Sequence, residues 1–339
     1  MFGRKKRRAD VPPPAVDDSQ QHISSGARTL RPMRDADVPR ALEIIESHDE
    51  DDAEEAVNSF EGRGIGHFWM LEVAGRAIGV TGVRPNAAAD AAGWLSWTYV
   101  HDDDCGNGHG RWMLATLLDE MQRRGVRMLF ISVSDYVDPE DGPVYAAAMH
   151  LYQALGFTID VANRDFYAPG ESQFLLAKRL APAASKEASD ALSTSVSPPV
   201  RQHGALPKSR SQPIGYQPGA ADELSPTDEE RGDAGFAEVE PVTDEHPPLQ
   251  LNKLDEIAET DGSFYIDWVE AGDQCFTADD VRKGVAAAKE QGARAVYITF
   301  PSNWPQVVAP LEAAGFVLNG ELKDYYRDGV GERHFVYRV

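Results

Sequence analysis

The stretch Val100-His-Asp-Asp-Asp-Cys-Gly-Asn-Gly-His-Gly-Arg111 carries three glycines at alternate positions between two regular elements. The apolar run 94–100 before it predicts a strand, and the run 112–122 after it has the spacing of a helix. Glycine accepts positive φ and lets the backbone approach a ligand closely. Free N–H groups at the start of a helix attract an anion. The stretch therefore predicts a phosphate-binding turn, although a tight strand-to-helix connection without a ligand would use the same glycines.

The composition favours an acidic protein with a substantial core. The chain has 339 residues, of which 42% are hydrophobic, and this length is enough for two domains. Its 33 basic and 55 acidic side chains give a net charge of −22, so nucleic acid is not expected as a partner. A cationic or amine-bearing substrate would suit this charge. Only two cysteines occur, Cys105 and Cys275, which excludes a disulfide framework and a cysteine-based metal site.

The termini and apolar runs give the expected location. No run approaches the roughly 18 apolar residues of a membrane span, so no membrane partner is expected. The basic start of the chain, 1–8, has no apolar segment behind it and is not a secretory signal. It could contact anionic lipid or nucleic acid, but a solvated tail is the favoured interpretation. These features predict a cytoplasmic protein.

Two segments interrupt the pattern of regular elements. Residues 1–27 are charged or rich in Pro, Ser and Gln, and residues 181–248 are rich in Pro, Ser and acid. Such segments bury too little apolar surface to offset their ordering entropy, so both are predicted to be disordered. Two domains remain, at 28–180 and 249–339.

The first domain alternates between strand and helix patterns. The predicted order is β-α-α-β-β-β-α-β-α-β-β, which is an α/β fold with a mixed sheet. The clearest predicted strands are 68–73, 77–83, 94–100, 128–133, 157–161 and 173–178, and the clearest helices are 110–124 and a segment from Pro143 to Leu155.

The second domain repeats features of the first in the same order. The segment 156–170, with Gly-Phe followed by Asp-Phe-Tyr, matches 315–329, with Gly-Phe followed by Asp-Tyr-Tyr, at a constant offset. Upstream, 125–133 matches 292–300. This ordered similarity suggests an internal duplication, and chance likeness of generic α/β segments is the alternative.

Two motifs of the first domain resemble those of the GCN5-related N-acetyltransferase (GNAT) superfamily. Residues 105–110 stand where that family has Arg/Gln-x-x-Gly-x-Gly/Ala, its pyrophosphate loop, and 148–157 is similar to Ala-x-x-Leu-Tyr-x-x-x-Gly-Phe. The resemblance covers about 28–180 and implies acetyl-CoA as co-substrate and an amine-bearing acceptor, a small molecule or a protein. It also implies a set of cofactor-binding residues: Tyr99, Val100, Cys105, Gly106, Asn107, Gly108, His109, Gly110 and Arg111.

The resemblance also implies a direct attack of the amine on the thioester. A backbone N–H at Tyr99–Val100 would polarise the carbonyl, and Tyr152 would protonate the leaving thiolate, with a packing tyrosine as the alternative. Three residues near the motif are candidates for the general base: His101, which we place first, Asp102 and Glu72. Cys105 could have a lowered thiol pKa at the start of a helix.

Departures from the family pattern leave a second function open. Cys105 replaces the loop Arg/Gln, and three acids, 102–104, lie beside the predicted pyrophosphate site. The alternative to an enzyme is therefore a non-catalytic module that senses acyl-CoA or binds a protein. The second domain resembles a partial, degenerate GNAT half, whose exposed sheet edges predict a close intramolecular contact or a homodimer. We expect acceptor specificity from loops at 50–66, 85–93 and 136–142.

Overall fold

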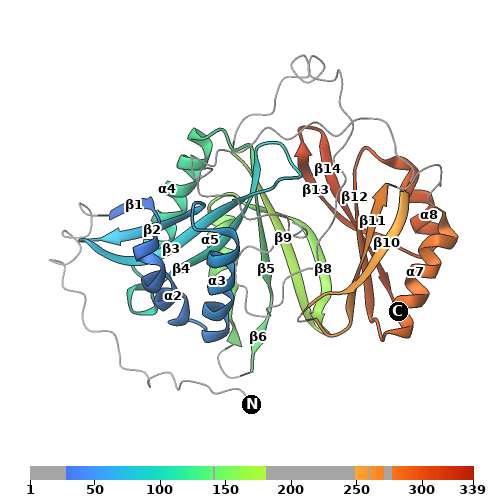
Figure 1. Ribbon diagram of the computed structural model, residues 1–339, viewed down its shortest axis with the longest axis horizontal. Helices are drawn as coiled ribbons and strands as arrows, with labels where there is room; N and C mark the ends of the chain where they lie inside the picture. Colours follow the sequence, from blue (N-terminus) through green and yellow to red (C-terminus); the bar gives the residue numbers. More distant parts are fainter. Residues whose placement is uncertain (1–27, 140–141, 181–248, 259, 271–276) are drawn as a thin grey trace.

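The computed structural model describes residues 28–139, 142–180, 249–258, 260–270 and 277–339. The predicted disordered segments, 1–27 and 181–248, lie outside the described residues. Twelve strands form one sheet in the order β1-β2-β3-β4-β5-β9-β8-β13-β14-β12-β11-β10 (Figure 1). We call residues 28–180 the N-terminal half and residues 249–339 the C-terminal half.

The N-terminal half has the predicted order of main elements in a mixed sheet. Only β4 and β5 are parallel, and the other pairs within this half are antiparallel. Its elements are β1 (Arg28–Pro32), α2 (Val38–Glu46), α3 (Glu50–Arg63), β2 (Phe68–Val73), β3 (Arg76–Pro85), β4 (Ala92–Val100), α4 (His109–Arg123), β5 (Met128–Ser134), β6 (Val137–Asp138), β7 (Gly142–Pro143), α5 (Ala146–Ala154), β8 (Thr158–Ala168) and β9 (Glu171–Arg179). The mixed α/β fold expected from the sequence is confirmed.

The C-terminal half repeats part of this topology. Its elements are β10 (Leu249–Glu256), β11 (Ser263–Glu270), α7 (Ala278–Glu290), β12 (Ala295–Pro301), α8 (Val308–Ala313), β13 (Val317–Arg327) and β14 (Val330–Arg338). The strand order β10-β11-β12-β14-β13 mirrors β3-β4-β5-β9-β8 across the middle of the sheet. The internal duplication itself stays a prediction.

The two halves meet along a seam between β8 and β13. These strands pair antiparallel, with Gly320 opposite Val161. A Cβ placed on Gly320 would lie 2.7 Å from the carbonyl oxygen of Asp160, so the close approach requires glycine. The predicted contact between the halves is therefore intramolecular.

Reciprocal arginine contacts hold the seam on either side of this pair. Arg127 Nη1, at the start of β5, donates to the carbonyl oxygen of Asp324 at 2.6 Å. Arg294 Nη1, at the start of β12, donates to the carbonyl oxygen of Asp165 at 2.5 Å. Both aspartates have positive φ, 51° at Asp165 and 54° at Asp324. Each half thus inserts one arginine into the bulged turn of the other.

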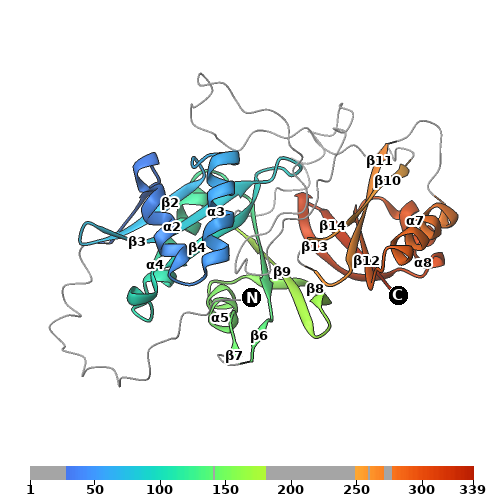
Figure 2. The same ribbon diagram turned by 60° about the horizontal axis from the view of Figure 1, so that its bottom comes forward.

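Helices cover both faces of the N-terminal half but one face of the C-terminal half. The core under α4 and α5 includes Leu117 and Ile131, and the core under α2 and α3 includes Ile44 and Met70. In the C-terminal half, α7 and α8 lie together on the outer side of the strands (Figure 2). The opposite strand face is turned toward the seam, where Phe166 of β8 packs with tyrosines of β11 and β12.

Two sequence predictions about elements are wrong, and a third is confirmed with a different length. Pro143 does not open a helix: it lies in the β6–β7 hairpin, and α5 starts at Ala146. Residues 50–66 are mostly the helix α3 and not a loop, because the buried residues Ala56 and Phe60 pack one side of that acidic segment against the core. The strand predicted at 157–161 is confirmed but is longer, because its pairing with β9 extends from Thr158 to Ala168.

Candidate functional site

The site begins where β4 and β5 separate. These strands pair only between Ala92–Trp94 and Met128–Phe130. The rest of β4, from Leu95 to Val100, is not paired with β5. Between the pairs Gly82–Ser96 and Val80–Tyr99, β4 contains one extra residue, and Trp97 has a φ of 40°. A bulge of this kind redirects the end of a strand and commonly lies beside a functional site. The sequence pattern gave no signal for it.

The turn after β4 leaves the start of α4 open. Gly106 and Gly108 have φ of 80° and 70°, and Gly108 is the residue before the helix, without a side-chain cap. A Cβ placed on either glycine would meet no atom within 4 Å, so space around the turn is unfilled. Helix α4 is 15 residues long, and its first N–H groups face this space with a positive helix end behind them. This geometry fits an anion.

The charged and titratable side chains around the turn differ in their contacts. Asp104 forms an ion pair with Arg76 at 2.5 Å, and Asp102 and Asp103 are exposed. His109 is 8% exposed, and its Nδ1 has no hydrogen-bond partner among the described residues. Burial, and then Arg28, lower the pKa of His109, so it is neutral near pH 7. Arg111 is exposed at the first turn of α4.

Cys105 is not an activated thiol. Burial raises its pKa, and the carboxylates of Asp102 and Asp104 raise it further. Its Sγ donates to the carbonyl oxygen of Val100 at 3.4 Å. The lowered thiol pKa expected from the helix start is therefore wrong, because desolvation and the nearby acids raise the pKa instead.

Tyr152 lies in the core beside the turn. It is 1% exposed and packs edge-to-face on Phe157, with ring centroids 5.9 Å apart. Burial raises its pKa well above the ordinary value, so the phenol stays protonated. The preceding residue of α5, Leu151, would lie 3.8 Å from a Cβ on Gly110, which places this helix against the start of α4. The structure thus brings the Tyr152 helix to the glycine turn.

Two of the three candidate bases have other side-chain contacts, and the third is exposed. His101 Nδ1 accepts a hydrogen bond from the Asp103 N–H at 3.3 Å. Asp102 is exposed. Glu72 pairs with Arg31, with Oε1 2.7 Å from Nη2. None of these contacts brings a carboxylate or imidazole into the opening between β4 and β5.

A buried hydrogen-bonded pair, Tyr99 and Asp52, lies under α3 and was not predicted from the sequence. The Tyr99 hydroxyl donates to Asp52 Oδ2 at 2.6 Å, and the two residues are 6% and 1% exposed. Burial raises the pKa of Tyr99, and the Asp52 charge raises it further. Asp52 was not predicted as a site residue because its acidic segment was expected to be a loop. The apolar residues Ala56 and Phe60 were the available signal for a helix there.

Two more groups extend this polar region toward the seam. Burial raises the pKa of Tyr145, and the charges of Asp52 and Glu171 are among the further causes. Glu171, which is 8% exposed, accepts a hydrogen bond from Ser134 Oγ at 3.0 Å. Two buried carboxylates and two buried phenols therefore line the region where β4 and β5 diverge. Such a region favours a cation over an anion.

The corresponding helix start in the C-terminal half is closed. Thr277 caps α7 by accepting from the Asp280 N–H at 3.2 Å, and Asp280 Oδ2 accepts from the Thr277 hydroxyl at 2.6 Å. Residues 271–276, just before this helix, lie outside the described residues. Four residues before its Gly-Phe pair, this half has Leu311 where the N-terminal half has Tyr152.

Among the described residues, no group of three or more His, Cys, Asp or Glu side chains is arranged to hold a metal ion. In the same parts of the chain, every helix is too short or too polar to cross a membrane.

Comparison with known proteins identifies the N-terminal domain. Residues 64–159 match the family described as acetyltransferase (GNAT) domain, so the chain contains a GNAT domain there. No curated protein sequence matches the chain. Similar solved structures include a GNAT-family protein from Desulfovibrio desulfuricans, at 22% identity and a TM-score of 0.40, covering 46% of this chain and 100% of that one. The ribosomal-protein-S18-alanine N-acetyltransferase of Escherichia coli has 23% identity, a TM-score of 0.38 and coverages of 47% and 97%. An acetyltransferase of Salmonella typhimurium, solved with acetyl-CoA, has 21% identity, a TM-score of 0.37 and coverages of 47% and 96%.

Proposed function

We propose that the GNAT domain of this chain is an acetyl-CoA-dependent N-acetyltransferase that acts on a primary amine by direct attack. One observation carries the proposal: an uncapped helix start with two left-handed glycines lies beside a bulged strand that separates from its parallel neighbour. Both features lie within the residues that match the family. They offer an anion site and an adjacent opening in a sheet, which is what a long phosphorylated thioester requires.

The residues present fit acetyl-CoA. Backbone N–H groups of 106–111 would hold the pyrophosphate, and these donors do not depend on the side chain that Cys105 replaces. His109, neutral and with an unpartnered Nδ1, could add a hydrogen bond, and Arg111 a positive charge. When bound, the co-substrate supplies the acetyl group and a thiolate leaving group. The end of β4, at Tyr99 and Val100, would present a backbone N–H to the carbonyl oxygen.

Proton transfers are assigned to two buried tyrosines. In transfer to an amine, a C–N bond forms, the C–S bond breaks, the amine loses a proton and the thiolate gains one. Tyr152, kept protonated by burial, would protonate the thiolate. The Tyr99–Asp52 pair would take the amine proton, with Asp52 as the final acceptor. His101 stays the alternative base from sequence, although its Nδ1 is already engaged.

A non-catalytic acyl-CoA-binding module is the second candidate. The specific observation in its favour is Cys105 in place of the loop Arg/Gln, beside Asp102 and Asp103. Loss of that donor would weaken binding, and exposed acids would repel a polyphosphate. Under this candidate, acetyl-CoA binds but no amine is acetylated.

Titration calorimetry with acetyl-CoA, followed by turnover with an amine panel, tests the proposal. We expect one site per chain and release of CoA only when an amine is present. Binding without turnover on any amine would support the module instead. Absence of binding at millimolar acetyl-CoA would overturn both. A cytoplasmic location and a homodimer stay predictions from sequence.

A further inference from the structure

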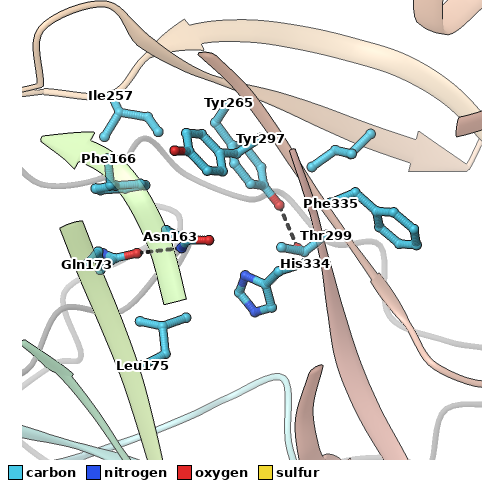
Figure 3. A pocket seen from close by; sticks show the side chains of 11 residues that line it. Asn163, Phe166, Gln173, Leu175, Ile257, Tyr265, Tyr297, Thr299, His334 and Phe335 are labelled. Atoms are coloured by element: carbon cyan, nitrogen blue, oxygen red, sulfur yellow. Dashed lines mark hydrogen bonds between the residues drawn. The ribbon is translucent and has the colours of Figure 1, made fainter. Parts of the chain in front are cut away.

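A pocket lies at the seam, between the two halves of the chain. Figure 3 shows Asn163 and Gln173 of the N-terminal half facing Thr299 and His334 of the C-terminal half, with Leu175 below them. The enclosed space of the pocket is about 30 Å³, and the unfilled space rises to about 400 Å³ when the solvent in its open mouth is counted. Its walls are largely apolar and aromatic, which is the usual make-up of a site for an organic group.

The polar groups of the pocket are neutral or internally paired. Asn163 Nδ2 donates to Gln173 Oε1 at 2.9 Å. The hydroxyls of Tyr265 and Thr299 lie 2.7 Å apart. His334 Nε2 is 3.1 Å from Glu332 Oε2, and both residues are buried. Because its walls carry no unpaired charge, the pocket suits an uncharged apolar or aromatic group.

The pocket continues the polar region of the candidate acetyl-transfer site. Gln173 pairs with Ser134, and Leu175 with Ser132, across β9 and β5. Ser134 donates to Glu171, which lies two residues before Gln173 on the same face of β9. Two residues along a strand span about 7 Å. A single short ligand can therefore reach from the buried carboxylate of Glu171 to the pocket.

We propose that this seam pocket is the acceptor-specificity pocket, and that the acceptor is an amine carrying an aromatic or branched apolar group about 7 Å from its nitrogen. The proposal rests on the proposed acetyltransferase function. The ammonium is held by the carboxylates of Asp52 and Glu171, and the apolar group enters the pocket. The C-terminal half then has a role in the reaction without a cofactor site of its own: it supplies the far wall.

A pair of amines that differ only in the apolar group tests the pocket. The ratio of kcat/KM for 3-phenylpropylamine to that for propylamine would be measured with the full chain at saturating acetyl-CoA. Burying a phenyl group is expected to favour the aromatic amine by on the order of tenfold or more. Leu175→Ala, from one half, and Thr299→Leu, from the other, should each reduce this ratio several-fold while the KM for acetyl-CoA stays unchanged.

Leu322→Ala is the matched control. Leu322 is fully buried in the same apolar cluster as Leu175 but does not line the pocket. It should lower stability and leave the amine ratio as in the wild type. A wild-type ratio near one, or a high ratio that survives both pocket variants, would overturn the pocket assignment alone. Failure to acetylate propylamine as well, or to bind acetyl-CoA, would overturn the underlying function.

Discussion

The starts of α4 and α7 occupy equivalent places in the two halves and differ in one respect. The start of α4 has glycine before it and no side-chain cap, whereas Thr277 and Asp280 form a reciprocal capping box at α7. A capping box satisfies the first N–H groups and places a carboxylate there. The start of α4 is therefore available to an external anion, whereas the start of α7 is already occupied by the carboxylate of Asp280. This difference predicts a single cofactor site among the described residues, at the start of α4.

The halves also differ at the seam, despite its reciprocal contacts. Arg127 and Arg294 each donate to three carbonyl oxygens, but Arg127 is only 6% exposed. Arg294 is half-buried. The Arg127 contact is the more desolvated of the two, so its removal should lower the free energy of unfolding more than removal of the Arg294 contact.

Gly108→Asp should produce the largest difference between the halves. A carboxylate beside the bound pyrophosphate, about 4 Å away at an effective dielectric constant near 20, costs about 4 kcal/mol, or about 1,000-fold in affinity. The matched control is Gly292→Asp at the end of α7, where φ is 88° and a Cβ also meets no atom within 4 Å. It introduces a comparable backbone strain of about 1–2 kcal/mol. Calorimetry with acetyl-CoA should show lost binding for the first variant only; equal effects would contradict the one-site comparison.

Arg127→Met should destabilise the seam by about 3 kcal/mol, because it leaves buried carbonyl oxygens without donors. Arg294→Met, at the partly exposed reciprocal position, should cost about 1 kcal/mol. Urea unfolding at pH 7 measures both. Equal losses would show that the two contacts are energetically equivalent.

Tyr152→Phe should lower kcat about 100-fold, the usual effect of losing a general acid, with the acetyl-CoA affinity retained. Tyr326→Phe is the control, since that buried hydroxyl donates to Glu332 near the seam and should affect stability alone. Because burial raises the pKa of Tyr152, wild-type kcat should show no alkaline decline from this group below about pH 10. Full activity of the Tyr152 variant at pH 7 would reject the acid role.

Asp324→Asn should give the smallest effect, and the effect should depend on pH. Burial raises the pKa of Asp324, but hydrogen bonds from Arg179 and the Gly329 N–H outweigh it and hold the pKa below its ordinary value. A lowered folded-state pKa contributes stability above about pH 4, and this contribution disappears as pH falls through the folded-state pKa. For a partly exposed pair, the loss at pH 7 should be about 1 kcal/mol.

Urea unfolding of wild type and Asp324→Asn at pH 7 and near pH 2 tests this dependence. The two proteins should differ at pH 7 and converge in acid. Asp165→Asn is the reciprocal comparison, with Arg338 at 3.7 Å in place of Arg179 at 2.8 Å, and should lose less. A constant difference across pH would assign the effect to the turn and not to the ion pair.

The sequence determined the order of elements, the glycine turn and the Tyr152 helix, because these depend on local patterns. Apolar periodicity identifies strands and helices, and alternate glycines identify a turn that needs positive φ. The predicted order includes a second helix before the second strand, but residues 50–66 were assigned to a loop, since acidic residues conceal the two apolar positions that are buried on one side of α3.

Only the tertiary structure decided which groups meet between the halves. The Tyr99–Asp52 pair joins residues 47 positions apart, and Arg127 reaches an oxygen 197 positions away. The bulge at Trp97 and the seam pocket depend on strand register and on the pairing of β8 with β13. No local pattern encodes such contacts, because their energy comes from burying groups that the chain brings together only when both halves have folded.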